Sequence, residues 1–223
     1  MSDAIGQVLL FGVAVSLVPI PIIGVVLMLG SPRARSNGPA FIVGWIAGLA
    51  LAGTIVLLIS SGADASEEGG PADWVNVLKL VLGVLLLLVA LAQWRGRPRG
   101  GQEAAMPKWM QAIDAFKPGK AAAFGVLLSA GNPKNLVFVA GAAAAIAQTG
   151  ASAADQAVAL AVFVVIGTIG VGLPVAIYFA LGERSKPILD ELKDWMAQHN
   201  AAIMAVLCLL IGTKLIGDAI SGF

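Results

Sequence analysis

The sequence predicts an all-α integral membrane protein with six transmembrane helices, arranged as two inverted three-helix repeats with broken first and fourth helices. Of the 223 residues, 58% are hydrophobic and only 12% are charged. The hydrophobic residues form runs long enough to cross a bilayer as helices, without the alternation that is typical of membrane barrels. Prolines interrupt the first and fourth runs, and paired interruptions of this kind indicate a transporter-like repeat.

Each predicted span rests on an apolar run with polar or aromatic ends. The spans are about Ala4–Gly30, Pro39–Ser61, Trp74–Trp94, Ala121–Gln148, Gln156–Leu181 and Ala201–Ile220. Trp74 and Trp94 bracket the third span as interfacial anchors. No Lys or Arg precedes Arg33, so the first span lacks the basic region of a cleavable signal peptide, and we expect it to be retained.

The fourth span contains the stretch Ser129-Ala130-Gly131-Asn132-Pro133-Lys134-Asn135 near its middle. Pro133 lacks an N–H group and clashes with the carbonyl group four residues earlier. We expect Gly131 to end one half-helix in the left-handed region, and Asn132 and Pro133 to begin the next. The second half would then present free N–H groups and a positive dipole end near the membrane centre, where anions bind readily.

Lys134 favours a binding site over a simple proline kink at this position. A lysine near the bilayer centre costs roughly 3 kcal/mol on insertion scales. It lies roughly 20 Å from either end of the span at 1.5 Å per residue, which is too far for easy snorkelling. We therefore predict a substrate site made of Pro19, Pro21, Ser129, Asn132, Pro133, Lys134 and Asn135.

The loops between the spans separate by charge. Basic residues occur in the first, third and fifth loops, at Arg33, Arg35, Arg95, Arg97, Arg99, Lys108, Lys117, Lys120, Arg184, Lys186 and Lys193. The second and fourth loops carry only acidic charges, at Asp64, Glu67, Glu68, Asp73 and Asp155. The positive-inside rule then places the odd loops in the cytoplasm and both termini outside the plasma (inner) membrane.

Two cytoplasmic segments are amphipathic, Pro107–Phe116 and Pro187–Met196. We expect both to be short helices lying at the inner membrane interface, with a partner-binding role as the alternative.

An internal repeat is indicated by matching residues in the two halves. Phe11-Gly12-Val13, Ser16 and Pro21 match Phe124-Gly125-Val126, Ser129 and Lys134 at one constant offset. We treat the chain as a single transmembrane domain, residues 1–223, with repeats at about 1–94 and 121–223 and a cytoplasmic linker at about 95–120. The second and fifth spans are rich in glycine, which favours close helix packing, with a hinge at Gly170 and Pro174 as the alternative.

The remaining intramembrane charges are mostly basic. Lys214 can pair with Asp218 one turn later, whereas Lys79 has no carboxylate at that spacing in its own helix and can reach the outer headgroups. No Asp, Glu or His lies deep in a span, which argues against a metal carrier and a carboxylate proton relay. The lone Cys208 excludes a paired-thiol electron carrier. Because no nucleophile–base pair, phosphate-binding loop or basic patch occurs, we expect no enzyme activity, no cofactor and no nucleic-acid partner.

Several motifs carry a family resemblance: Pro19-Ile20-Pro21, Ser31-Pro32-Arg33-Ala34-Arg35 with Asn37-Gly38, Gly44-Trp45, and Gly131-Asn132-Pro133-Lys134-Asn135. They resemble the actinobacterial GAP family, the glycolipid- or sulfolipid-addressing proteins of the LysE superfamily of exporters. The resemblance implies a six-helix inverted repeat and a role in moving a glycolipid or anionic lipid toward the cell surface. Alternatives are a small-solute exporter for amino acids or anions, and an accessory subunit of a larger lipid-export complex. A homo-oligomer or a cell-envelope partner fits either role.

Overall fold

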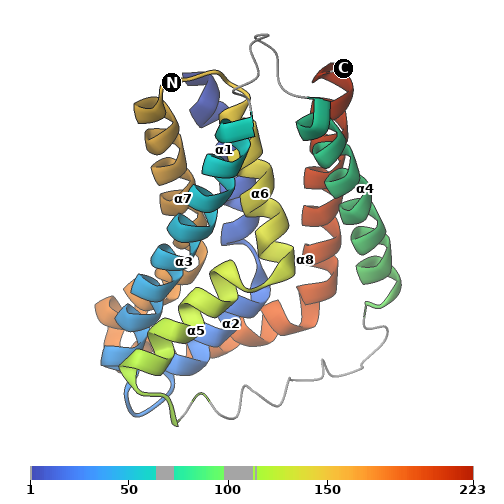
Figure 1. Ribbon diagram of the computed structural model, residues 1–223. Coiled ribbons are helices and arrows are strands. Elements are labelled where there is room, and N and C mark those ends of the chain that lie inside the picture. The colour runs from blue at the N-terminus through green and yellow to red at the C-terminus, as the bar shows by residue number, and fades with distance from the viewer. Residues whose placement is uncertain (1, 64–72, 98–112, 114, 223) are drawn as a thin grey trace.

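The computed structural model describes residues 2–63, 73–97, 113 and 115–222, and these residues are helical apart from short connections. The helices are α1 (Ser2–Ser16), α2 (Pro19–Leu29), α3 (Ala34–Ala63), α4 (Asp73–Arg95), α5 (Pro118–Ala130), α6 (Pro133–Ala147), α7 (Ala153–Leu181) and α8 (Ser185–Gly222). A single 3₁₀ turn, η2 (Gly182–Arg184), joins α7 to α8 (Figure 1). The prediction of an all-helical protein is confirmed.

The helices are apolar enough for a membrane protein. By length and composition, Ala34–Ser60, Asn76–Arg95 and Ala153–Gly222 qualify as membrane spans, and the bent pair formed by α1 and α2 qualifies as a fourth. The longest stretch holds two helices, because α7 runs down one side of the bundle and α8 returns up another (Figure 1).

Both predicted helix breaks are present. The first lies between Ser16 and Pro19, where the helix direction changes by 52°. The second lies between Ala130 and Pro133. Pro19 begins α2 and Pro133 begins α6, so these two prolines correspond in the structure. This pairing differs by one residue from the constant offset that the sequence match indicated.

The predicted conformation of Gly131 is wrong. This residue has φ −96° and ψ −12°, which is right-handed, and its N–H donates to the carbonyl of Leu127. A side chain at this position is excluded by crowding instead, since a Cβ atom would lie 2.7 Å from that carbonyl oxygen.

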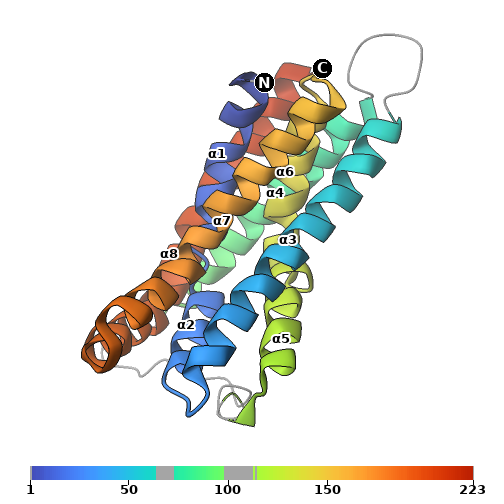
Figure 2. The ribbon, with the colours of Figure 1, turned by 90° about the vertical axis from the view of Figure 1, so that its left-hand side faces the viewer.

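The glycine-rich helices make the closest contacts. Helix α3 packs on α5, α1 packs on α7, and α4 pairs with α8 (Figure 2). A Cβ atom on Gly44 would lie 1.9 Å from the Ala122 carbonyl oxygen, and one on Gly170 would lie 1.6 Å from that of Ser16. Helix α7 continues unbroken through Pro174. Close packing, rather than a hinge, therefore accounts for Gly170.

The chain connections gather at two ends of the bundle. The α2–α3 junction, the start of α5 and η2 lie toward the bottom of Figure 1, and α4 ends in its lower half. The start of α1, the end of α3, the start of α4, the α6–α7 junction and the end of α8 lie at the top. The helix ends that flank the three basic loops therefore share one end of the molecule.

The two amphipathic segments have different outcomes. Most of Pro107–Phe116 lies outside the described residues. Pro187–Met196 is part of α8 instead of a separate helix, and this part of α8 lies across the bottom of the bundle (Figure 1). Its predicted single apolar face is divided, because Leu189 is buried whereas Trp195 is exposed.

Candidate functional site

The break between α5 and α6 is built as the sequence predicts on the α6 side. Asn132 has an extended backbone, and its side-chain oxygen accepts a hydrogen bond of 3.1 Å from the backbone N–H of Lys134. Pro133 occupies the first turn of α6, where its missing N–H group costs nothing. The predicted N-cap is confirmed, and it fixes the direction in which α6 leaves the break.

Asn135 holds the other side of the same break, a role that the sequence reasoning missed. Its side chain is fully buried, and its Nδ2 donates to the carbonyls of Leu128 and Ser129 at 3.3 Å each. These carbonyls lie in the last turn of α5, where the helix leaves them without an N–H partner. The Oδ1 atom of Asn135 is buried without a hydrogen-bond partner among the described residues.

Ser129 is a packing residue at the contact between α5 and α3. Its hydroxyl donates to the carbonyls of Gly125 and Val126 within α5, at 2.8 and 3.1 Å. A Cβ atom on Gly48 of α3 would lie 2.0 Å from the Ser129 oxygen. The hydroxyl therefore faces α3 and is already bonded within its own helix.

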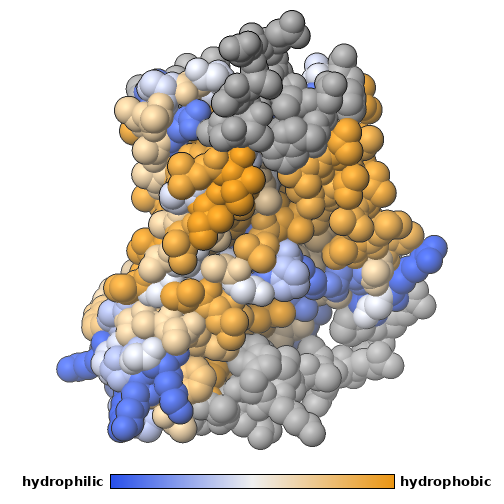
Figure 3. All heavy atoms as spheres, viewed as in Figure 1, coloured by the Kyte–Doolittle hydropathy of each residue, from blue (hydrophilic) through white to orange (hydrophobic). Residues whose placement is uncertain are grey.

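Lys134 is half-buried in the first turn of α6. No carboxylate of the described residues forms an ion pair with it. Hydrophilic atoms interrupt the apolar surface about halfway along the molecule, at the level of the α5–α6 break (Figure 3). The break therefore combines an uncompensated ammonium group with the N-terminus of a 15-residue helix.

The first break lacks polar groups of this kind. Pro19 and Pro21 are buried in the first turn of α2, and Val18 precedes them without a side-chain cap. Helix α2 meets α5 further along, where Gly24 faces Phe124 and Leu128. Pro19 and Pro21 thus supply buried apolar surface, and their part in substrate binding stays a prediction.

The two secondary lysines lie at the top end of the bundle, and one prediction about them is wrong. Lys214 forms the expected ion pair with Asp218 and also donates to Gln7 at 2.8 Å. Lys79 does not extend to the outer surface, because it is only 4% exposed and donates to the side-chain oxygen of Gln148, the C-cap of α6. The acceptor of the Lys79 ammonium group is therefore a residue 69 positions away in the sequence.

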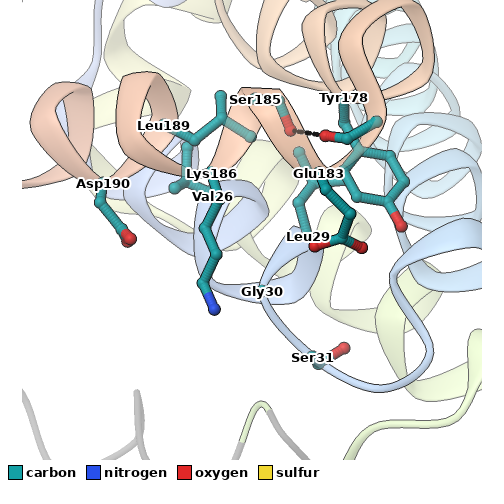
Figure 4. Close-up of a pocket in the computed structure, with 11 residues that line it drawn as sticks. Val26, Leu29, Gly30, Ser31, Tyr178, Glu183, Ser185, Lys186, Leu189 and Asp190 are labelled. Carbon is teal, nitrogen blue, oxygen red and sulfur yellow. Dashed lines mark hydrogen bonds between the residues drawn. The ribbon is translucent and has the colours of Figure 1, made fainter.

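A pocket of about 150 Å³ lies at the opposite end, between the end of α2, the end of α7 and the start of α8 (Figure 4). It is lined by polar groups of both charges, including Glu183, Lys186 and Asp190. The Ser185 hydroxyl donates to the carbonyl of Gly182 at 2.6 Å, which holds the turn into α8. This pocket therefore carries charges of both signs, whereas Lys134 is the charged side chain at the α5–α6 break.

Among the described residues, no group of three or more His, Cys, Asp or Glu side chains comes close enough to hold a metal ion.

A comparison with protein families gives a match to the family described as Sap, sulfolipid-1-addressing protein (SfLAP), over residues 8–221. This range includes both helix breaks. No curated protein matches the chain. No solved structure matches it.

Proposed function

The chain belongs to the sulfolipid-1-addressing protein family, and from this premise we propose that it is a transporter that flips or exports an amphipathic lipid toward the cell surface. The lipid carries an anionic or sugar headgroup. One observation carries the proposal: Lys134 stands without a carboxylate partner among the described residues, beside the N-terminal end of α6, in a stretch that we predict to cross the membrane. A half-buried, unpaired cation in a membrane span is costly unless an anion accompanies it.

The headgroup and the acyl chains require different surfaces. The headgroup binds at the start of α6, where Lys134 and the backbone N–H groups of the first turn supply positive charge. The acyl chains remain against apolar helix faces. A groove of about 550 Å³ between α4 and α8 supports this, because Leu91, Trp94 and Leu209 are among its apolar lining residues.

We also propose that the protein crosses the membrane six times as two inverted repeats, as in the LysE superfamily. In this arrangement α1 with α2 corresponds to α5 with α6, α3 to α7, and α4 to α8. The packing supports it, since Gly170 of α7 contacts Ser16 of α1 whereas Gly48 of α3 contacts Ser129 of α5. Inverted repeats of this kind allow one half to rock against the other around a central site.

The orientation follows from the loop charges. The basic loops face the cytoplasm and both termini face outward across the plasma membrane. The purified protein is then sufficient for movement of the lipid, with no enzymatic step and no cofactor.

The test is lipid movement in proteoliposomes that contain the purified protein and a fluorescent sulfated glycolipid. Lys134→Met should reduce headgroup translocation by roughly tenfold or more, because a charge-assisted contact is lost. Lys134→Arg should retain part of the activity, since the charge stays but its geometry changes. Lys120→Met, at an exposed lysine near the bottom end, is the matched control and should transport as wild type does.

The remaining outcomes separate the alternatives. Normal translocation by Lys134→Met would end the anion-site proposal. Translocation that requires an added partner protein would favour an accessory subunit of a lipid-export complex. Uptake of free amino acids or inorganic anions, without lipid movement, would favour a small-solute exporter.

A further inference from the structure

A second cavity lies at the top end of the bundle, far from the pocket of Figure 4. This cavity is open to the surface and lies between α1, α4, α6 and α8, and Gln7, Lys79, Gln148 and Asp218 are among its lining residues. Its volume is about 370 Å³, within the range of roughly 300–1,000 Å³ that is usual for small-ligand sites. The ends of these four helices meet at the top of Figure 1.

The charges at this cavity do not balance. Lys214 and Asp218 pair with each other, and both act electrostatically on Lys79. The three groups therefore share one environment that contains two positive charges and one negative charge. No carboxylate of the described residues forms an ion pair with Lys79. Among the described residues, one buried positive charge is left without a counter-charge of its own.

The hydrogen bonds hold Lys79 in place without neutralising it. Its ammonium group has three N–H donors, and among the described residues its acceptor is the side-chain oxygen of Gln148. Gln148 is oriented in turn, because its amide Nε2 donates to the Oδ1 atom of Asn76 at 3.3 Å, and the Nδ2 atom of Asn76 donates to the Gly222 carbonyl at 2.7 Å. A neutral amide offsets only part of the cost of burying an ammonium group.

We infer that this outer cavity is a second anion site, which binds a tetrahedral oxyanion, either the sulfate or phosphate ester of a lipid headgroup or the free inorganic ion. The anion supplies the missing negative charge to Lys79 and accepts its remaining N–H groups. The inference rests on the proposed function only in the case of the headgroup. There the cavity receives the headgroup on the outer side after it leaves Lys134.

The first test measures thermal unfolding of the purified protein in sodium sulfate and in sodium chloride at equal ionic strength. Sulfate should raise the melting temperature of the wild type, because a ligand that binds the folded state stabilises it. Lys79→Gln should lose this increase, whereas Lys79→Arg should keep most of it. The comparison is made in a Lys134→Met background, which removes any sulfate bound at the α5–α6 break, and the exposed-site control Lys120→Gln should keep the increase because it does not line this cavity.

A second variant covers the case in which Lys79→Gln fails to fold. Gln148→Glu keeps an acceptor for Lys79 and gives it a permanent counter-charge, although it loses the hydrogen bond that Nε2 donates to Asn76. It should abolish the additional effect of sulfate. A sulfate effect that persists in Gln148→Glu or in Lys79→Gln would overturn the inference.

The source of the anion is settled in lipid nanodiscs of phosphatidylcholine. A sulfated glycolipid and its desulfated counterpart are each added to wild type and to Lys79→Gln. Stabilisation by the sulfated lipid alone, dependent on Lys79, identifies a headgroup site, and stabilisation by inorganic sulfate alone identifies a free-anion site. The absence of both in the wild type would overturn the inference. A Lys79-dependent effect without any lipid transport would refute the proposed function and leave the second anion site intact.

Discussion

Two asparagines stabilise the α5–α6 break through hydrogen bonds, and neither bonds to the charged group of Lys134. Asn132 caps the helix that begins, and Asn135 binds carbonyls of the helix that ends. Both hydrogen-bond sets use neutral amide groups. Lys134 takes part only through its backbone N–H. Removing its ammonium group therefore leaves the geometry of the break intact, so the Lys134 variants report on ligand binding.

Asn132 can be tested separately from Lys134. Asn132→Ala should lower the free energy of unfolding by about 1 kcal/mol, because the N-cap hydrogen bond is lost. Asn132→Asp should keep the stability, since Asp is an equally good cap, but should reduce transport by placing a negative charge beside Lys134. Unfolding in mixed micelles and translocation in proteoliposomes measure the two effects. Equal stability of Asn132→Ala and wild type would contradict the assigned cap.

At the scale of the helices, small residues decide which pairs approach each other. Helix α7 lies against α1 at Gly170, and α3 lies against α5 at Gly44 and Gly48. Each contact brings a position without a side chain onto the backbone or the hydroxyl of the neighbouring helix. Close approach of this kind is a common means of helix association in membranes.

The two glycines of α7 that flank Val171 give a matched pair of variants. Gly170→Ala should destabilise the protein by roughly 1–3 kcal/mol, because its Cβ would lie 1.6 Å from the Ser16 carbonyl oxygen. Gly172→Ala should be neutral or stabilising by up to about 1 kcal/mol, because no atom lies within 4 Å of its Cβ position. Melting temperatures in one detergent decide the comparison. A Gly170→Ala protein as stable as Gly172→Ala would show that α1 and α7 are less closely packed than described.

At the scale of the whole molecule, the charge pattern and the fold both distinguish two ends of the bundle. The helix ends that flank the basic loops gather at the bottom of Figure 1, with the mixed-charge pocket of Figure 4. The cavity around Lys79 lies at the other end. If the loop charges set the orientation, the proposed outer anion site faces away from the cytoplasm.

This orientation can be measured with single cysteines in a Cys208→Ser background. Ala154→Cys and Gly119→Cys are exposed positions at the two ends of the bundle, in the first turns of α7 and α5. An impermeant maleimide added to intact cells should label the former and not the latter. The reverse pattern would invert the proposed topology.

The sequence predicted the features that depend on neighbouring residues and missed those that depend on distant ones. The break at Asn132 and Pro133 and the pair between Lys214 and Asp218 were predictable, because caps and same-helix pairs are local. The acceptor of Lys79 lies 69 residues away on another helix, and no sequence pattern indicates it. The hydrogen bonds from Asn135 to α5 were missed for a different reason. The carbonyl groups that accept them are near in sequence, but they are free to accept only because α5 ends there. The prediction for Gly131 was wrong because glycine at a helix end usually indicates a left-handed conformation. Here glycine is required instead because a side chain would collide with Leu127.

The broken helix also constrains how the protein is made. With 13 and 15 residues, α5 and α6 are each shorter than the roughly 20 residues that a helix needs to enter the membrane unaided. Lys134 adds to the difficulty at the point where the two halves join. Helix α3 is synthesised earlier, and its glycine-lined face at Gly44 and Gly48 is the surface on which α5 packs. If α5 and α6 together form a span, as we propose, we expect them to enter the membrane as a pair packed on α3, so that insertion of the second half of the chain depends on the first.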